Sequence, residues 1–120
     1  MNDGVRRALE RDRTIDTTTI GRRSGRPQRI EIWFHNLDGR LYITGLPGRR
    51  DWYANLLANP EFTFHLKQSA QADLLARALP ITDDAARREV LTKVLRRLRR
   101  DDLEHWVADA PLVEVVLNRD

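Results

Sequence analysis

Four arginines gather in one short segment, GRRSGRPQR, at residues 21–29. No acidic residue interrupts them, and Gly21 and Gly25 bracket the first part of the segment. Glycine adopts positive φ without strain, so successive backbone N–H groups of this turn could point into one concavity that accepts an anion. A guanidinium matches the geometry of a phosphate or carboxylate better than an ammonium does. The segment therefore predicts a phosphate-binding turn formed by Arg22, Arg23, Arg26 and Arg29, with a solvated basic hairpin as the alternative.

Two strands flank this turn. Residues 14–20 are rich in threonine and isoleucine, whose branched side chains pack well on a pleated surface. Residues 28–35 alternate, because Ile30, Ile32 and Phe34 fall on one face and Arg29, Glu31 and Trp33 on the other. The tetrapeptide NLDG then predicts a hairpin to a strand over residues 40–45.

The remaining elements alternate in a way that predicts a closed sheet with helices outside it. Helices are expected over residues 4–12 and 52–58, the second capped by Asp51 and ended by a left-handed Asn59 before Pro60. Strands are expected over 61–67, 72–79 and after Pro111, with a long helix from Thr82 and a short helical piece around Trp106. Six antiparallel strands of this length must close or be covered. We predict a mainly β (α+β) domain over residues 1–120, a small six-stranded antiparallel split barrel flanked by helices, like the FMN-binding split barrels.

Composition places the chain among globular proteins. Hydrophobic residues make up 41% and charged residues 32%, cysteine is absent, and no apolar run approaches the ~20 residues of a membrane span. Residues 1–13 show no secretory signal, and the missing cysteines exclude disulfides and thiolate metal sites. We expect a cytoplasmic protein with no integral membrane segment.

The three histidines and a second basic segment do not indicate a further functional site. His35, His65 and His105 have no metal-ligand spacing and no serine or cysteine partner, so no metal site and no catalytic residue are assigned. The basic run at residues 96–100 suits the C-terminal end of a helix. It is followed by DDLE, whose acidic residues would reduce the attraction of this surface for a nucleic-acid phosphate backbone. We therefore expect no nucleic-acid partner.

Two sequence blocks, in this order, resemble the deazaflavin-dependent nitroreductase family of split-barrel proteins that use coenzyme F-420. The first is TTIGRRSGRP, at residues 18–27 with the preceding Thr17, and the second is WYANLLANP, at residues 52–60. The family patterns are roughly T-T-x-G-R-[KR]-[ST]-G-x-P-R, followed by a strand rich in Trp or Tyr, and W-Y-x-N-L-x-A-N-P; Gln28 stands where many members have a basic residue. The resemblance covers residues 15–79, and the last third of the chain carries no recognisable motif.

The resemblance implies a cofactor site. In the family the basic turn binds the phosphate-bearing tail, the following strand lines the deazaflavin ring, and the end of the next strand and the start of the W-Y-x-N helix complete the pocket. The implied cofactor-binding residues are Arg22, Arg23, Ser24, Gly25, Gln28, Arg29, Ile30, Glu31, Ile32, Trp33, Ile43, Thr44, Gly45, Asp51, Trp52, Tyr53 and Asn55. Trp52 and Tyr53 have the alternative of simply docking the helix on the barrel.

The implied activity is an F-420-dependent oxidoreductase, or nitroreductase, that passes hydride from the reduced 8-hydroxy-5-deazaflavin to a small conjugated acceptor of the quinone, nitroaromatic or enone type. An arginine-lined entrance fits such an anionic cofactor. Two alternatives stay open: the same barrel with FMN, and a non-catalytic module that binds F-420, a flavin, haem or a lipid. Split barrels of this superfamily commonly form dimers, and an outward-facing Trp33 is compatible with a homodimer.

Overall fold

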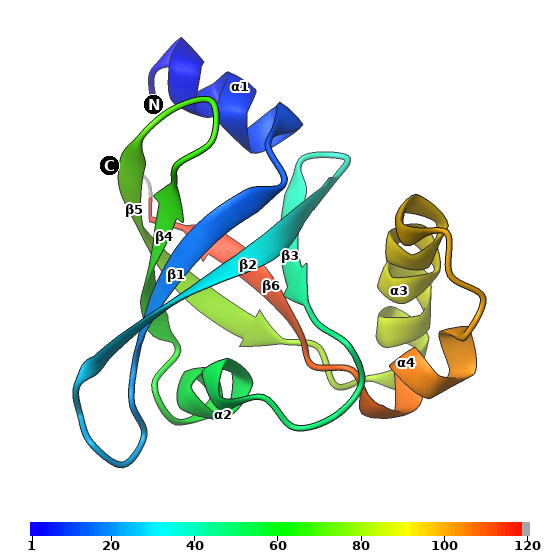
Figure 1. Cartoon of the computed structure of the whole chain (residues 1–120). Coiled ribbons are helices and arrows are strands. Elements are labelled where there is room, and N and C mark those ends of the chain that lie inside the picture. The colour runs from blue at the N-terminus through cyan, green and yellow to red at the C-terminus, as the bar shows by residue number, and fades with distance from the viewer. Residues whose placement is uncertain (119–120) are drawn as a thin grey trace.

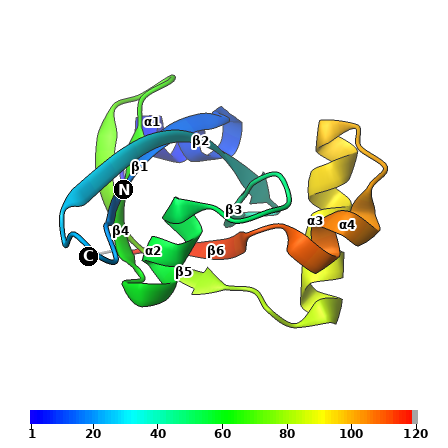
Figure 2. The same cartoon turned by 60° about the horizontal axis from the view of Figure 1, so that its bottom comes forward.

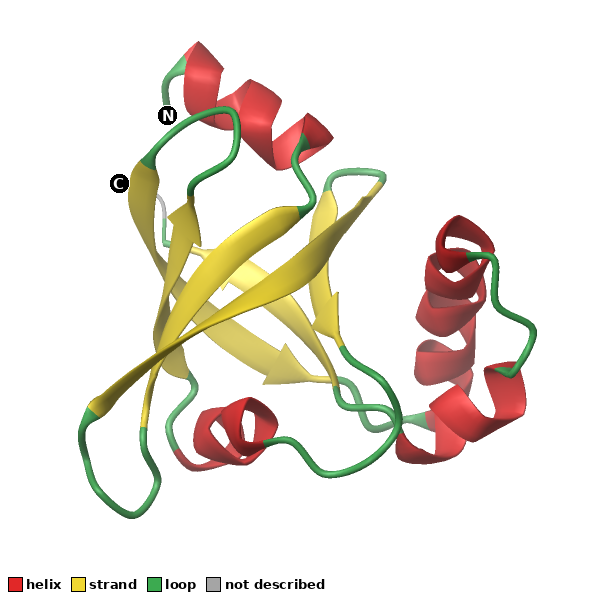
Figure 3. Ribbon diagram, in the orientation of Figure 1, coloured by secondary structure: helices red, strands yellow, loops and turns green. Residues whose placement is uncertain are grey.

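The computed structural model describes residues 1–118, and within them six strands close into one antiparallel barrel in the order β1-β2-β3-β6-β5-β4 (Figures 1 and 3). The strands are β1 (Thr14–Ile20), β2 (Pro27–Leu37), β3 (Arg40–Thr44), β4 (Glu61–Leu66), β5 (Ala72–Pro80) and β6 (Leu112–Leu117). The helices are α1 (Asp3–Arg11), α2 (Asp51–Ala58), α3 (Asp84–Leu98) and α4 (Leu103–Asp109). The predicted six-stranded barrel with flanking helices is confirmed.

The barrel interior holds the apolar residues that the alternating pattern points inward. Ile15, Phe34, Ile43 and Phe64 are all at most 1% exposed, and the rings of Phe34 and Phe64 meet edge to face with centroids 5.2 Å apart. Such aromatic pairs stabilise a core beyond their buried area. In Figures 1 and 2, α1 and α2 lie at opposite ends of the barrel.

A second core lies outside the barrel wall. Tyr42 and Leu112 face outward from β3 and β6 and pack with Leu91, Leu95 and Trp106 of α3 and α4. In Figure 1 these two helices stand side by side next to β3. Helices α3 and α4 therefore form a separate C-terminal wall beside the barrel, on the outer face of β3 and β6. None of the helices within residues 1–118 is long and apolar enough to cross a membrane.

The β2–β3 hairpin has the turn that its sequence predicts. Asp38 and Gly39 both have positive φ, at 55° and 90°, and they join the paired residues Leu37 and Arg40. A two-residue loop with two positive φ values is the type I′ turn, whose twist matches that of the flanking strands. Asn36 adds a hydrogen bond, because its Oδ1 accepts from the Gly39 N–H at 2.8 Å.

Three local predictions about helix ends were wrong. Arg50 is the N-cap of α2 and makes no side-chain cap, so Asp51 lies in the first turn, where an acidic group favours the positive end of the helix dipole. Asn59 is extended, at φ −145°, because Pro60 disfavours helical backbone in the residue before it. The long helix was predicted to begin at Thr82, but α3 begins at Asp84. Its N-cap is Asp83, whose carboxylate accepts from the Ala86 N–H at 2.9 Å.

Candidate functional site

Hydrogen bonds between its own residues hold the arginine-rich turn between β1 and β2 in shape. The Gly21 N–H donates to the Arg26 carbonyl at 2.8 Å, the Gly25 N–H to the Gly21 carbonyl at 2.9 Å, and the Arg26 N–H to Ser24 Oγ at 3.1 Å. Gly25 has φ +70°, which confirms that this position needs glycine. Gly21 does not have positive φ. A Cβ there would lie 2.5 Å from Ser24 Oγ, so a larger residue would displace this side chain and its hydrogen bond to Arg26.

The backbone N–H groups of the turn are only partly committed. Those of Gly21, Gly25 and Arg26 are paired within the turn, and the Arg22 N–H is paired with Asn55. The successive N–H groups of Arg23 and Ser24 have no hydrogen-bond partner within residues 1–118. These two groups and the arginine side chains are the donors of the turn that could hold an anion.

Asn55 of α2 fixes the turn to the barrel. Its side-chain oxygen accepts from the Arg22 N–H at 3.1 Å and from Arg22 Nη1 at 3.0 Å, and its Nδ2 donates to Thr19 Oγ1 at 3.2 Å and Gln28 Oε1 at 3.3 Å. Asn55 is 1% exposed. Arg22 also lies 3.4 Å from Asp51. One buried amide thus joins the turn, both flanking strands and α2, which brings together the two sequence blocks of the resemblance.

The four arginines of the segment have different surroundings. Arg22 is held by Asn55 and Asp51, and Arg29 donates to Asp16 at 2.9 Å. Arg23 and Arg26 are exposed, and neither has an acidic partner within residues 1–118. The free positive charge of the turn is therefore carried by Arg23 and Arg26, with Arg22 positioned beside them.

The outer face of the barrel next to the turn is tied by ion pairs. Lys67 Nζ lies 2.6 Å from Asp16 and also bonds Glu31, while Arg29 contacts the other Asp16 oxygen. The Lys67 hydrogen bond is the largest cause that lowers the pKa of Asp16, followed by a smaller opposing effect of burial. Arg29 and Glu31 thus already have protein partners that hold β2 against β1 and β4.

Strand β2 has an open edge beside these residues. It pairs with β1 along residues 27–33, but with β3 only from Phe34 onward. The Phe34 N–H donates to Arg13 across β1, and antiparallel bonding alternates, so the backbone groups of Arg29, Glu31 and Trp33 point away from β1. Within the described chain, no strand covers this edge. It is the split in the barrel wall.

Trp33 and the end of β3 line a cavity of about 350 Å³ next to that edge. Its other walls come from α3, α4 and the loop after β3; the full lining is Trp33, His35, Thr44, Gly45, Leu46, Leu98, Arg100 and Trp106. Arg13 lies 5.2 Å over the Trp33 ring and Arg100 lies 5.5 Å over the Trp106 ring. Three predicted site residues, Trp33, Thr44 and Gly45, are therefore brought together.

Sequence reasoning missed the contribution of α3 and α4 to this cavity. Trp106 was assigned to a short helix and Arg100 to a basic run, and neither position carries a local signal of a site. Their place depends on the packing of α3 and α4 on Tyr42 and Leu112 of the barrel.

The remaining predicted residues lie apart from this cavity. Ile43 and Trp52 are buried in the barrel core, Ile32 packs against that core, and Ile30 is on the same strand face but exposed near the turn. Their side chains stabilise the scaffold, and Ile43 could meet a ligand only through its backbone.

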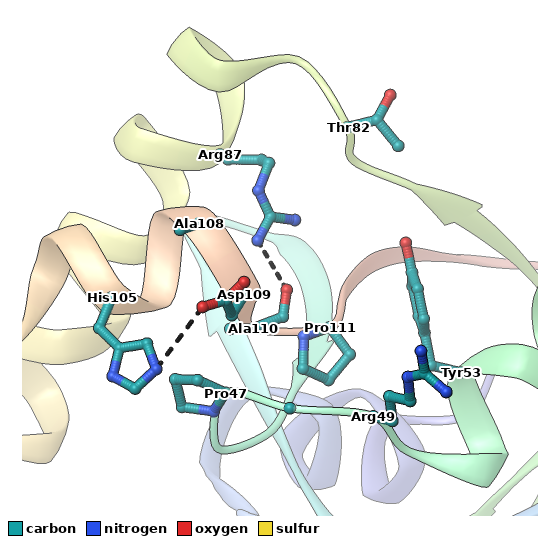
Figure 4. Close-up of a pocket in the computed structure, with 11 residues that line it drawn as sticks. Pro47, Arg49, Tyr53, Thr82, Arg87, His105, Ala108, Asp109, Ala110 and Pro111 are labelled. Carbon is teal, nitrogen blue, oxygen red and sulfur yellow. Dashed lines mark hydrogen bonds and ion pairs between the residues drawn. The ribbon is translucent and has the colours of Figure 1, made fainter.

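Tyr53 lines a different cavity, of about 530 Å³, between α2, α4 and the start of α3 (Figure 4). Arg87 forms one wall, and its buried guanidinium donates to four backbone carbonyls, among them Ala110 at 2.6 Å. Three of these carbonyls, those of Trp106, Val107 and Ala110, lie at the C-terminal end of α4, where a cation is favourable, and the fourth is that of Ile81. Arg49 and the pair of His105 and Asp109, 3.7 Å apart, complete this polar surface.

Comparison with solved structures shows the same fold. The chain is similar to the conserved hypothetical protein Rv2991 from Mycobacterium tuberculosis, with 20% identity, a TM-score of 0.74, and coverage of 99% of this chain and 82% of that one. It is also similar to an F420 reductase, with 22% identity, a TM-score of 0.71, and coverage of 99% and 97%. A FAD-binding protein from Mesorhizobium loti matches with 14% identity, a TM-score of 0.65, and coverage of 96% and 86%.

No curated protein sequence matches the chain. The model of one protein family, described as F420H2-dependent quinone reductase, matches residues 2–116. This match spans the turn, the open edge of β2, both cavities and the C-terminal wall. The chain therefore belongs to the F420H2-dependent quinone reductase family.

Proposed function

We propose that this protein is an oxidoreductase that binds coenzyme F-420 along the open edge of β2 and passes hydride to a small conjugated acceptor. The observation that carries the proposal is the position of that edge. It lies between the arginine-rich turn at one end and the Trp33–Gly45 cavity at the other. When bound, a reduced deazaflavin would supply a hydride, which carries two electrons, and the protein would orient it and limit side reactions.

The length and the chemistry of the open edge of β2 support binding of this cofactor. From Gln28 to Trp33 the extended strand rises about 17 Å, at about 3.4 Å per residue. An elongated molecule with a flat ring at one end and an anionic tail at the other could therefore contact both regions. Free backbone N–H and C=O groups at Arg29 and Glu31 suit the hydrogen-bonding edge of a flavin-like ring. The guanidinium groups of Arg23 and Arg26 suit a phosphate.

The roles follow from the contacts. Arg23 and Arg26 would bind the phosphate, and Arg22 would assist while it holds the turn to Asn55. Ser24, Gly25 and Gln28 shape the turn and its junction with α2, since Ser24 accepts from Arg26 and Gln28 accepts from Asn55. Trp33, Thr44 and Gly45 would form the ring end of the site. Tyr53, on the far cavity, would act mainly by packing against Trp52, 5.9 Å away.

The test is a fluorescence titration of the purified protein with F-420 and, separately, with FMN. Tight quenching by F-420 is expected. The double variant Arg23→Ala/Arg26→Ala should weaken F-420 binding by about 1.5–3 kcal/mol for each charge-assisted bond removed, roughly tenfold or more in Kd per bond. A matched control is Arg7→Ala/Arg11→Ala on α1, at the other end of the barrel, which changes the net charge equally and should leave the affinity unchanged.

Three outcomes would contradict parts of the proposal. Tighter binding of FMN would favour the flavin alternative. Tight F-420 binding without oxidation of the reduced cofactor by quinones or nitroaromatics would favour a carrier. Equal effects of the two arginine pairs would contradict the placement of the phosphate. A homodimer and a cytoplasmic location stay predictions, and light scattering on the eluting protein measures the first.

A further inference from the structure

His35 differs from the other two histidines of the chain. His65 has partners for both ring nitrogens, Thr18 Oγ1 at 2.7 Å and Asp73 at 2.7 Å, and His105 lies on the surface near Asp109. His35 is 3% exposed, lines the cavity of Trp33 and Trp106, and has a buried Nδ1 without any hydrogen-bond partner within the described residues. An unpaired buried polar atom normally costs stability, so its presence at a cavity calls for a functional reason.

The surroundings fix the charge and the tautomer of this ring. Burial is the main cause that lowers the pKa of His35 from 6.5 to about 4, and the charges of Arg97 and Arg13 lower it further. The ring is therefore neutral at pH 7 and carries one N–H. Because Nδ1 is enclosed without an acceptor, a proton there would be a buried unpaired donor, so the N–H belongs on Nε2.

Two other polar side chains of the cavity wall already have protein partners. The Thr44 hydroxyl donates to the Pro111 carbonyl at 2.6 Å, and the Arg100 guanidinium bonds Asp102 at 2.8 and 3.0 Å while it stacks on Trp106. The rest of the wall is largely apolar and flat, with Trp33, Leu46, Leu98 and Trp106. Within the described residues, His35 and the buried indole N–H of Trp106 are thus side-chain groups of this cavity without a protein partner, and His35 is the titratable one.

We propose that this cavity binds the electron acceptor as a flat conjugated carbonyl compound of the quinone class, and that the Nε2–H of His35 donates a hydrogen bond to its carbonyl oxygen. The proposal rests on the proposed function, because the acceptor would occupy the part of the cavity lined by His35, Leu46, Leu98 and Trp106. This part lies beside Trp33, Thr44 and Gly45, which would form the ring end of the cofactor site. Apolar walls with one well-placed donor are the usual composition of a small-molecule site, and about 350 Å³ is at the small end of their range.

A donor at this position would act on the reaction as well as on binding. During reduction a C–H bond of the reduced deazaflavin breaks, and its hydrogen and electron pair form a new bond on the quinone. The quinone is reduced to the hydroquinone monoanion, and the deazaflavin is oxidised. Negative charge grows on the carbonyl oxygen, so a fixed donor stabilises the transition state more than the ground state. The last proton comes from water, since a neutral imidazole N–H is too weak an acid to supply it.

The test uses the cofactor-free protein and menadione, a naphthoquinone, as the probe. Binding is followed by quenching of tryptophan fluorescence, and the state of His35 by 15N NMR of the histidine rings. His35→Leu should raise the Kd for menadione roughly five- to tenfold, as expected for one neutral hydrogen bond. His35→Gln keeps a donor and should recover part of the affinity. His105→Leu, an exposed histidine outside this cavity, is the matched control and should change nothing.

Two further readouts separate a binding role from a structural one. The wild-type NMR spectrum should show an Nε2–H tautomer of His35 at pH 7 whose Nε2–H signal shifts on addition of menadione. His35→Leu should also unfold at a higher urea concentration than wild type, because it removes the unpaired nitrogen. A structural role alone would make it unfold at a lower one.

The proposal is overturned if menadione does not bind, if His35→Leu and wild type bind it equally, or if the proton is on Nδ1. The NMR measurement decides the tautomer even if His35→Leu does not fold. Failure of the proposed function would give a different result. If menadione binding depended on His35 but F-420 did not bind, the proposed acceptor cavity would be supported and the proposed cofactor would be contradicted.

Discussion

Replacing Asn55 by alanine tests whether one buried amide holds the candidate site together. Asn55 is 1% exposed and makes four hydrogen bonds, two from Arg22 to its oxygen at 3.0 and 3.1 Å and two from its nitrogen to Thr19 and Gln28 at 3.2 and 3.3 Å. The longer pair contributes less. Loss of the bonds, and the burial of an unpaired Arg22 N–H, should together cost about 2–4 kcal/mol.

The assay is urea unfolding followed by tryptophan fluorescence, with F-420 affinity measured on the same protein. For a domain of this size, a loss of about 3 kcal/mol corresponds to a decrease in Tm of roughly 12 °C. F-420 binding should weaken about tenfold, because Arg23 and Arg26 lie on the turn that Asn55 positions. Gln28→Ala is the matched control: it removes one 3.3 Å contact at an exposed residue and should cost less than about 0.5 kcal/mol.

A loss of stability below about 1 kcal/mol in Asn55→Ala would refute the reasoning, since water or a neighbouring side chain would then replace the amide without cost. A full loss of stability with unchanged F-420 affinity would refute the second step. In that case the turn would be anchored by Asn55 but would not bind the cofactor.

Two further predictions concern stability. The unfolded chain protonates His35 near pH 6.5 and the folded protein only near pH 4, so stability is lost as the pH falls through this interval, by about 3 kcal/mol in total. Urea unfolding at pH values from 7.5 to 4 measures this loss, and the His35→Leu variant should lack the contribution of His35 to it. If the free energy of unfolding fell equally with pH in both proteins, the lowered pKa of His35 would be contradicted. Arg99 ends α3 with φ 57° and ψ 48°, a conformation that favours glycine, so Arg99→Gly should stabilise the protein by about 1 kcal/mol. Calorimetry measures this gain, and an unchanged or lower Tm would mean that contacts of the arginine outweigh its strain.

The sequence was sufficient for those parts of the fold that depend on local physics. The alternation in residues 28–35 predicted a strand, and Asp38-Gly39 predicted a tight hairpin, because both patterns act over a few neighbouring residues. The errors at Asp51 and Asn59 are also local. A helix can begin one residue earlier when its first turn makes a tertiary contact, and Asp51 contacts Arg22.

The arrangement of the site depends on contacts between distant segments and could not be predicted in the same way. Asn55 meets Arg22 across 33 residues, and Trp106 and Trp33 line one cavity only because α3 and α4 pack on the outer face of β3 and β6. The resemblance named Asn55 as a cofactor-binding residue and did not indicate that it anchors the turn. The unpaired nitrogen of His35 has no sequence signal at all, since it is defined by what the surrounding elements fail to supply.

The open edge of β2 explains why the arginines of the turn should decide which cofactor binds. An uncovered strand edge invites pairing with another chain, and proteins usually cover or blunt it. Here residues 27–33 stay uncovered on one side, which is understandable if a ring with its own amide-like edge takes the place of a strand. Deazaflavins and flavins share that pyrimidine edge, so the strand alone cannot distinguish them. The difference between the two cofactors lies in the tail, and F-420 carries a phosphate plus further carboxylates, whereas FMN ends in its phosphate. The exposed guanidinium groups of Arg23 and Arg26, which have no acidic partner within residues 1–118, favour the longer and more anionic tail.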